Sequence, residues 1–333
     1  MLEHGGRLER AARDYGIARD AWLDLSTGVS PYGWPVPPIP PRVWQRLPED
    51  DDGLLDAARA YYGVHDLLPV AGSQAAIAAL PRLRARSRVA VIEPTYAEHA
   101  HAWRQAGHEV TSLTLADLLA RVADFDVVIV VRPNNPTGEC ASREQLVDAM
   151  RRRSADTGAS MCDMPWLIVD EAFVDTRPQE SLLADRCEGL VVLRSVGKFF
   201  GLAGARAGFV AAWPALLDAL AEALGPWTLS GPTRYALTHA LADTAWQATA
   251  RDWLQRTSSR LATLLSGHGL PPSGGCEFFQ YVRHDRAGAL HDALARRAVL
   301  VRHFATPQAL RFGLPADDAA FAQLDRALAE VLA

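Results

Sequence analysis

The sequence predicts an α/β protein that has a large domain built on a mostly parallel sheet and a smaller C-terminal α/β domain. The chain has 333 residues, which is too many for one small core and suits two domains of unequal size. From about Leu68 to Trp213, short apolar runs alternate with helix-like stretches, as parallel strands and crossover helices do. After Trp213 the alternation stops, and long helical stretches lead to a second, shorter group of strands.

Five strands and three helices of the large domain are identified by apolar runs and by helical spacing. The expected strands are Arg88–Ile92, Asp126–Val131, Trp166–Asp170, Leu190–Arg194 and Ala207–Ala212. The expected helices are Gly72–Arg84, Glu98–Ala106 and Arg143–Thr157. Polar turns follow the first three strands. Because ligands of open α/β sheets bind at the carboxyl ends of strands, we expect the chemistry in these turns.

The rest of the chain is expected to form an N-terminal strap, a linking helix and the small domain. Residues 1–35, which become proline-rich from Pro31, are expected to pack on the small domain and the active site. Residues 36–220 form the expected large domain, and 221–333 the linking helix and the small domain. Helices are expected at Ala215–Leu224, Tyr235–Leu265 and Asp317–Leu332, and strands at Glu277–Val282, Val299–Arg302 and Ala309–Phe312.

Composition excludes several classes of protein. The 34 basic and 39 acidic side chains give a net charge of −5, and without a basic stripe nucleic acid is not an expected partner. The charged stretch Met1–Gly16 lacks the apolar core of a secretory leader, and no stretch has the apolar length of a membrane helix. The four cysteines are widely spaced, so neither a metal site nor a disulfide framework is expected. We expect a cytoplasmic protein without a membrane partner.

One lysine stands out among the basic residues. Of the 34, only Lys198 is lysine, so 33 are arginine. On a solvated surface the two replace each other at little cost, and the exception therefore marks a place where a guanidinium fails. An amine can form a Schiff base with a carbonyl, whereas arginine stays protonated. The count alone leaves chance as an equal alternative, and the neighbouring residues decide.

Residues that suit a phosphate group surround this lysine in the sequence. Ser195 precedes Lys198 after a strand, and Arg206 follows it, so a hydroxyl and a guanidinium can reach one phosphate. A helix is expected to begin at Gly72-Ser73-Gln74, and the free backbone N–H groups of its first turn can reach the same phosphate. A plain helix N-cap remains the alternative for this last segment.

Three further side chains follow expected strands. Asp170 ends an apolar strand, and a buried carboxylate there needs a cation such as a protonated pyridine nitrogen. Asn135 can donate to a ring hydroxyl, and Tyr96 can stack on a planar ring. Each has an ordinary structural alternative: a strand-end aspartate that caps a turn, a turn asparagine before proline, and an aromatic that covers the sheet edge.

With these parts in this order, the chain resembles the fold-type I family of pyridoxal 5′-phosphate (PLP) enzymes. The motifs are Pro133-Asn134-Asn135-Pro136-Thr137-Gly138 and Ser195-x-x-Lys198 followed by Arg206, and the resemblance covers nearly the whole chain. It implies a seven-stranded sheet, PLP as cofactor and a homodimer. It implies Lys198 and Asp170 as catalytic residues, and these cofactor-binding residues: Gly72, Ser73, Gln74, Tyr96, Asn135, Asp170, Phe173, Ser195, Lys198 and Arg206.

Within this family the chain is most similar to the branch of histidinol-phosphate aminotransferases and threonine-phosphate decarboxylases, and it matches the decarboxylase pattern better. The motifs are His4-Gly5-Gly6, Leu25–Gly33 and Gly225–Pro232. A backbone nest beside His4 suits a substrate phosphate, and arginine forks suit a carboxylate. The implied substrate-binding residues are His4, Gly5, Gly6, Ser30, Asn135, Arg302 and Arg311. A disordered N-terminus and surface arginines are the alternatives.

The resemblance implies PLP-dependent decarboxylation of L-threonine O-3-phosphate to (R)-1-amino-2-propanol O-2-phosphate, a lyase reaction of cobalamin biosynthesis. The alternatives are a histidinol-phosphate-type aminotransferase and a non-catalytic regulator. Two positions depart from the aminotransferase pattern. Phe173 replaces a usual tyrosine, and Leu47 stands where the family often has a tyrosine that reaches a neighbouring subunit. Tyr61 or Tyr62 is a candidate replacement for the second.

Overall fold

The computed structural model describes residues 4–153, 164–185 and 187–332, and the chain divides into two compact units. The larger unit comprises Trp34–Asn135 and Cys140–Gln247. The smaller unit comprises Met1–Gly33, Pro136–Glu139 and Ala248–Ala333. No helix among the described residues is long and apolar enough to cross a membrane.

The larger unit extends beyond the boundary expected at residue 220, and it ends at Gln247. The reason is that helix α10 (Gly231–Ala242) packs against α3 (Leu54–Tyr62) of the same unit. The N-terminal segment through Gly33 joins the smaller unit, where strand β1 (Leu23–Leu25) pairs in parallel with β11 (Val299–Ala305).

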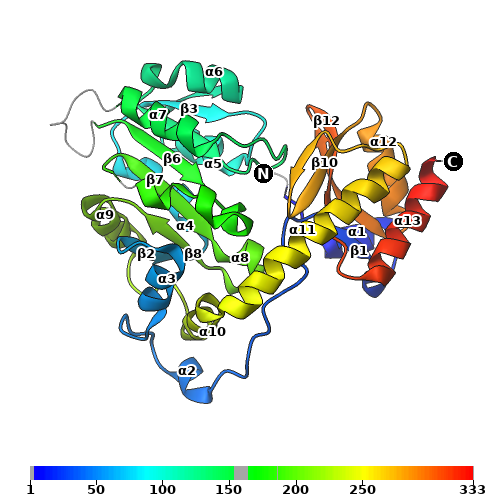
Figure 1. The fold of residues 1–333 in the computed structure, drawn as a ribbon, viewed down its shortest axis with the longest axis horizontal. Coiled ribbons are helices and arrows are strands. Elements are labelled where there is room, and N and C mark those ends of the chain that lie inside the picture. Colours follow the sequence, from blue (N-terminus) through cyan, green and yellow to red (C-terminus); the bar gives the residue numbers. More distant parts are fainter. Residues whose placement is uncertain (1–3, 154–163, 186, 333) are drawn as a thin grey trace. The chain divides into compact units, whose positions relative to one another are not determined.

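A seven-stranded sheet forms the centre of the larger unit, in the order β2-β8-β7-β6-β5-β3-β4 (Figure 1). Strands β3 to β7 run parallel to their neighbours among themselves, while β8 is antiparallel to both β2 and β7. The expected mostly parallel, seven-stranded sheet is therefore confirmed. The strands are β2 (Leu67–Val70), β3 (Arg88–Ile92), β4 (Glu109–Leu113), β5 (Val127–Val131), β6 (Trp166–Asp170), β7 (Leu190–Ser195) and β8 (Gly208–Ala211).

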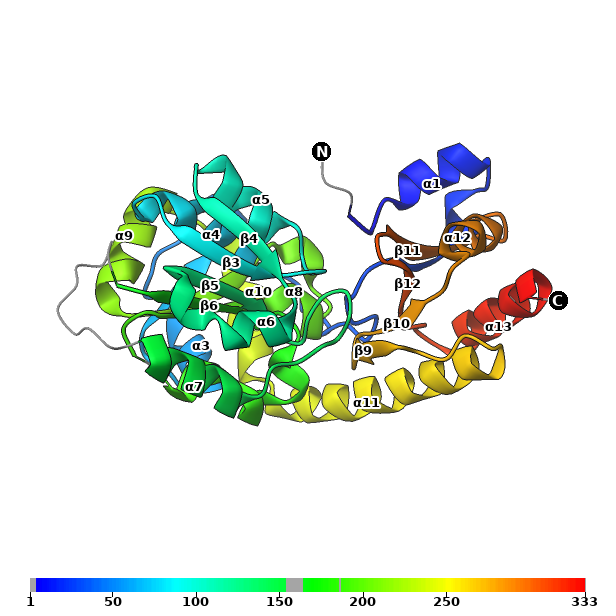
Figure 2. The ribbon, with the colours of Figure 1, turned by 90° about the horizontal axis from the view of Figure 1, so that it is seen from above.

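Helices bury both faces of this sheet, which explains why its central strands read as continuous apolar runs. All residues of β5 and β6 are buried. On one face, side chains such as Val127 and Ile168 form a core with Trp103 and Leu216. The helices that cover this face are α4 (Ser73–Ala79), α5 (Glu98–Gln105) and α9 (Pro214–Leu224), and Figure 2 shows α7 (Arg143–Arg153) on the other.

Two strands of this sheet are absent from the sequence prediction. These are β2 and β4, and β4 has too few apolar residues to be recognised, because it lies at the sheet edge. The helix expected over Tyr235–Leu265 is two helices, α10 and α11 (Thr244–Gly267). The break falls at Asp243, which has a non-helical ψ of 76° and accepts the backbone N–H of Trp246. Of the helix expected to end at Thr157, residues 154–157 lie outside the described residues.

The remaining helices of the larger unit are short. They are α2 (Pro41–Gln45), α6 (Leu115–Ala120) and α8 (Val196–Phe199). Helix α11 begins in the larger unit and continues into the smaller one.

The smaller unit is built on a five-stranded sheet in the order β1-β11-β12-β10-β9. Its other strands are β9 (Gly274–Cys276), β10 (Phe279–Arg283) and β12 (Gln308–Gly313), and its other helices are α1 (Leu8–Tyr15), α12 (Ala287–Ala295) and α13 (Asp318–Leu332). Helix α12 packs on β11 and β12, and α1 contributes Ala11 to a core with Trp22 and Leu300. The sequence prediction of a smaller α/β domain is confirmed, although β1 and β9 were not foreseen.

A buried ion cluster stabilises the turn after β6. The Arg194 guanidinium lies 2.9 Å from the Glu171 carboxylate and 2.7 Å from that of Asp175, and all three side chains are at most 3% exposed. Tyr61 donates a hydrogen bond to Asp175, and the Tyr62 ring lies beneath the guanidinium. Burial lowers the pKa of Arg194, but the charges of Asp175 and Glu171 outweigh it and raise that pKa.

Replacing Arg194 with methionine is expected to lower the free energy of unfolding by about 3–5 kcal/mol, because the buried Asp175 carboxylate loses its cation and Glu171 keeps only the more distant Arg132, at 3.8 Å. Urea unfolding followed by tryptophan fluorescence measures the loss. The control is Arg121→Met, which breaks an ion pair with Asp124 whose side chains are both 52% exposed. This control should lose less than about 1 kcal/mol. Equal losses in the two variants would contradict the cluster's role.

Candidate active site

The candidate site of the larger unit lies at the carboxyl ends of two neighbouring strands, where β6 ends at Asp170 and β7 ends at Ser195. Gly208, the first residue of β8, pairs with Ser195 on one side and with Val70, the last residue of β2, on the other. The pairing therefore aligns the end of two strands with the start of a third, and the predicted residues gather there.

Gly72, Ser73 and Arg206 meet beside Ser195. Gly72 has a φ of +73°, and a Cβ built on it would lie 2.9 Å from a terminal nitrogen of Arg206. A Cβ on Gly208 would lie 2.8 Å from the backbone nitrogen of Ser73. Only glycine fits at these two positions. The arrangement gathers a guanidinium, a hydroxyl and the first turn of α4, which are donors suited to a phosphate group.

Lys198 lies in α8, directly after β7, and its ammonium nitrogen is 5.9 Å from the centroid of the Phe173 ring. Phe173 follows β6 and is buried. The structure therefore brings the single lysine to the end of the strand that carries Asp170. At the position where the family resemblance implies a tyrosine, this chain has a ring that offers no hydrogen bond.

Asp170 is held by a residue that the sequence reasoning missed. One carboxylate oxygen of Asp170 lies 3.0 Å from Nε2 of His99, and the other accepts the backbone N–H of Ala172 at 3.1 Å. The side chains of His99 and Asp170 are 2% and 5% exposed. Both oxygens are thus fixed in direction. His99 lies on α5 and Asp170 is 71 positions further along the chain, so no local pattern in the sequence signals this contact.

Tyr96 and Gln74 are joined by side-chain hydrogen bonds. The Tyr96 hydroxyl donates to the Gln74 amide oxygen at 3.0 Å, and the Gln74 amide nitrogen donates to Glu98 at 3.2 Å. Burial, followed by the charges of Glu98 and Asp170, raises the pKa of Tyr96 to about 12, although Arg206 opposes the shift. Tyr96 stays a neutral phenol. Because the Gln74 side chain is committed to these bonds, a ligand would meet Gln74 through its backbone.

Asn135 follows β5 in a turn that its neighbour holds in place. Asn134 accepts a hydrogen bond from Thr95 at 2.6 Å and donates to the carbonyl of Pro94 at 2.8 Å. The turn after β5 is therefore tied to the turn after β3, which carries Tyr96. Asn134 therefore has a structural role, and Asn135 is the asparagine that we expect to donate to a ring hydroxyl.

The two predicted arginines of the smaller unit are cross-strand neighbours. Arg302 of β11 lies opposite Arg311 of β12. Arg311 is 6% exposed, with its guanidinium 5.0 Å from the Phe279 ring, and Arg302 lies over Phe304. Burial and the nearby charge of Arg302 lower the pKa of Arg311 to about 10. A bound anion would offset both effects.

The predicted substrate-binding residues near the N-terminus, which belong to the same unit, differ in their surroundings. Gly5 packs against the carbonyl of Ser26, and Gly6 against Thr27. His4 is half-buried. Ser30 is buried and donates its hydroxyl hydrogen to the carbonyl of Tyr32 at 3.0 Å. The Ser30 hydroxyl hydrogen is thus used within the chain, and only the hydroxyl oxygen can accept a hydrogen bond from a ligand.

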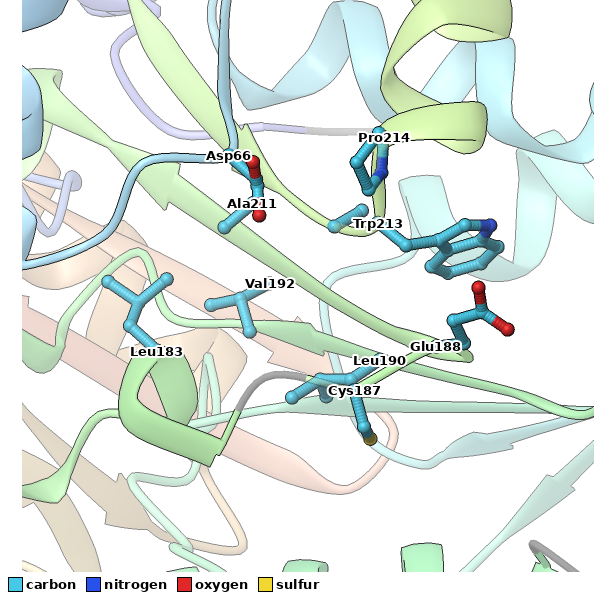
Figure 3. A pocket seen from close by; sticks show the side chains of 10 residues that line it. Asp66, Leu183, Cys187, Glu188, Leu190, Val192, Ala211, Trp213 and Pro214 are labelled. Carbon is cyan, nitrogen blue, oxygen red and sulfur yellow. The ribbon is translucent and has the colours of Figure 1, made fainter.

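A pocket of about 280 Å³ in the larger unit lies away from these residues (Figure 3). Leu190 lines it at the start of β7, whereas Ser195 ends the same strand. Tyr61 and Tyr62 also lie elsewhere than foreseen, because they belong to the Arg194 cluster. Their engagement there speaks against either of them replacing the missing tyrosine at position 47.

The family model described as aminotransferase class I and II matches residues 25–329. A threonine-phosphate decarboxylase of Pseudomonas aeruginosa is 54% identical over 98% of this chain and 97% of that relative. The chain belongs to the class I and II aminotransferase family.

Two further comparisons agree with this membership, one in sequence and one in fold. A threonine-phosphate decarboxylase of a Sinorhizobium species is 41% identical over 100% of this chain and 98% of that relative. The solved histidinol-phosphate aminotransferase of Sinorhizobium meliloti, in complex with pyridoxal-5′-phosphate, superimposes with a TM-score of 0.81 at 21% identity. The match covers 99% of this chain and 95% of that structure. This last likeness confirms the expected fold.

The cofactor of the family is PLP, and the residues of the larger unit fit it. The absence of a Cβ at Gly72 leaves the Arg206 guanidinium against the backbone, as a phosphate cradle requires. Asp170 is a buried carboxylate with both oxygens oriented, which suits a pyridinium nitrogen. Lys198 supplies the amine. Among the described residues no group of His, Cys, Asp and Glu side chains could hold a metal ion.

Replacing His99 with alanine is expected to weaken PLP binding about tenfold, because a buried carboxylate loses a charge-assisted hydrogen bond of roughly 1.4 kcal/mol or more. Titration of the apoprotein with PLP measures the change. His99→Gln, which retains an amide donor, should recover part of the affinity. His108→Ala is the control, since His108 is also buried but bonds Ser87 and Pro81. Unchanged affinity in His99→Ala, or an equal loss in the control, would refute this role.

Proposed function

We propose that this chain is a PLP-dependent lyase that decarboxylates L-threonine O-3-phosphate to (R)-1-amino-2-propanol O-2-phosphate, a step of cobalamin biosynthesis. The observation that carries the proposal is the 54% identity, over nearly the whole chain, to a protein named threonine-phosphate decarboxylase. The 41% identical relative carries the same name. The site geometry is consistent with it, because a lysine, an oriented carboxylate and a phosphate cradle lie at one sheet edge.

The larger unit is proposed to hold the cofactor. Ser195, Arg206 and the backbone of Gly72 and Ser73 would bind its phosphate, and Asp170 would keep its ring nitrogen protonated. Bound PLP supplies an electron sink for the electron pair left at Cα when carbon dioxide leaves. Lys198 would hold the cofactor through its amine and would supply the proton that Cα takes up.

Three other side chains of this unit are proposed to fix the ring. Tyr96 would stack on it, and Asn135 would donate to the ring oxygen. Phe173 would lie beside that oxygen without donating to it. This loss of a donor changes the basicity of the oxygen relative to an aminotransferase site. Gln74 would take part through its backbone.

The smaller unit is proposed to bind the substrate's anionic groups. The Arg311 and Arg302 guanidinium groups would hold the carboxylate, and His4 with the N–H group of Gly5 would hold the phosphate. Gly6, whose own N–H is bonded to the Ser26 hydroxyl, would support this segment. Ser30 and Asn135 complete the proposed substrate contacts. The direction in which a guanidinium fork points the carboxylate selects which bond to Cα breaks, so these arginines would favour decarboxylation over amino transfer.

The purified protein with PLP is expected to release carbon dioxide from L-threonine O-3-phosphate, and Lys198→Arg is expected to lose this activity by at least about a thousandfold, because a guanidinium cannot act as the amine. Borohydride reduction followed by peptide mass mapping should place the pyridoxyl group on Lys198. Amino transfer to 2-oxoglutarate without carbon dioxide release would favour the histidinol-phosphate-type aminotransferase instead. If the protein catalyses neither reaction, both assignments are refuted.

We further propose a cytoplasmic homodimer. Trp44, Leu47 and Trp227 are 66%, 64% and 60% exposed, and large apolar side chains left in water favour burial against a second copy. Leu47 also lines a groove of about 470 Å³. The three cysteines that the structure describes are free thiols, which suits a reducing compartment.

Sedimentation velocity is expected to find a dimer for the wild-type protein and a shift toward monomer for the double variant Trp44→Asp and Leu47→Asp. The reason is that burying two carboxylates at an interface costs several kcal/mol. The control is Arg121→Asp, which changes an exposed charge elsewhere on the larger unit. A monomeric wild-type protein, or a variant that remains dimeric, would refute the proposed interface.

A further inference from the structure

Ser26, the residue after β1, connects three segments of the smaller unit. Its hydroxyl donates to the Asp24 carboxylate at 2.6 Å and accepts the backbone N–H of Gly6 at 2.7 Å. Its own N–H donates to the same Asp24 oxygen at 2.9 Å. Its carbonyl accepts a hydrogen bond from Nη2 of Arg311 at 2.9 Å. Ser26 is 3% exposed, so water does not compete for these bonds.

The N-terminal segment can reach Ser26 only because residue 5 has no side chain. A Cβ built on Gly5 would lie 2.2 Å from the Ser26 carbonyl oxygen and 3.3 Å from its hydroxyl oxygen. The backbone at Gly5 therefore lies directly on the peptide that Arg311 contacts from β12. Gly313, two residues after Arg311, approaches the carbonyl of Thr27 equally closely, at 2.3 Å from a built Cβ.

Ser26 thus touches both groups that the proposed function assigns to substrate anions. Its hydroxyl holds the Gly5–Gly6 segment, and its carbonyl holds the Arg311 guanidinium. Asp24 fixes Ser26 itself through two bonds. Since both hydrogen bonds are made to one buried residue, Ser26 ties the position of the N-terminal segment to that of the guanidinium.

We propose that Ser26 is a positioning residue that sets the distance between the two anion-binding groups of the smaller unit. This inference rests on the proposed function, and it names how the substrate class is selected. We expect this spacing to favour an amino acid whose carboxylate and phosphate are separated as in L-threonine O-3-phosphate. L-Homoserine O-phosphate, which has one more methylene between the two groups, should be the poorer substrate.

The first test is kinetic and uses the PLP-loaded enzyme. Ser26→Ala keeps the carbonyl bond to Arg311 but loses the hydroxyl that holds Gly6. We expect KM for L-threonine O-3-phosphate to rise roughly 3–10-fold, as for one lost hydrogen bond, while kcat changes less than about twofold. We expect the preference for this substrate over L-homoserine O-phosphate, measured as a ratio of kcat/KM, to fall by a similar factor.

Ser258 offers a matched control in the same unit. It is buried, donates its hydroxyl to the carbonyl of Cys276 at 3.1 Å and accepts the amide of Gln280 at 2.8 Å. Ser258→Ala therefore removes the same number of hydrogen bonds without touching Gly6 or Arg311. It is expected to lose comparable stability and to leave KM within about twofold of wild type. An equal KM in the two variants overturns the proposal.

The second test does not depend on turnover. Freeing Gly6 should expose the following residue, Arg7, so trypsin should cleave after Arg7 several-fold faster in Ser26→Ala than in Ser258→Ala. If the wild-type enzyme releases no carbon dioxide, the proposed function fails and this comparison alone decides the role of Ser26. Equal cleavage of the two variants then overturns it.

A second variant covers the case in which Ser26→Ala does not fold. Gly5→Ala leaves Ser26 intact and places a methyl group against its carbonyl, so the N-terminal segment must move away. The same rise in KM and the same faster trypsin cleavage are expected. Wild-type values for both measurements in Gly5→Ala overturn the proposal.

Discussion

The close approach of β8 to the first turn of α4 is the contact on which the site of the larger unit depends. Gly208 lies between Ser195 and Val70 in the sheet, and its Cα faces the backbone nitrogen of Ser73 with no room for a side chain. This contact joins the end of β7 to the loop after β2, so that Ser195 and Gly72 both lie beside Gly208, and Arg206 lies against Gly72. Any larger residue at 208 would separate the groups that a phosphate needs together.

Asp170 and Glu171, which are adjacent at the end of β6, have different roles. Asp170 turns toward the site and is oriented by His99, whereas Glu171 turns into the buried cluster of Arg194 and Asp175. A strand directs successive side chains to opposite faces, which allows this division. The ion cluster makes the turn after β6 rigid, and Phe173, which contacts Lys198, belongs to that turn. The catalytic edge is thus supported by charges that never meet a ligand.

In the smaller unit, too, charged side chains are held in place by neighbouring groups. It presents Arg302 and Arg311 side by side on neighbouring strands, although two like charges repel. Aromatic rings under both guanidinium groups and the carbonyl of Ser26 hold them in place. Such an arrangement suits a carboxylate, which the proposed substrate provides.

The sequence by itself determined the fold class, the order of the site residues and the special status of Lys198. Those features are encoded locally, in apolar runs, in turn motifs and in the single lysine. It did not reveal β4, whose edge position needs few apolar residues, nor the break at Asp243. Only the tertiary structure decided that His99 orients Asp170 and that Ser26 links Gly6 to Arg311. These contacts join residues 71, 20 and 285 positions apart, and no local pattern records such separations. The close packing that makes glycine obligatory at positions 5 and 208 was likewise decided by neighbours distant in the chain.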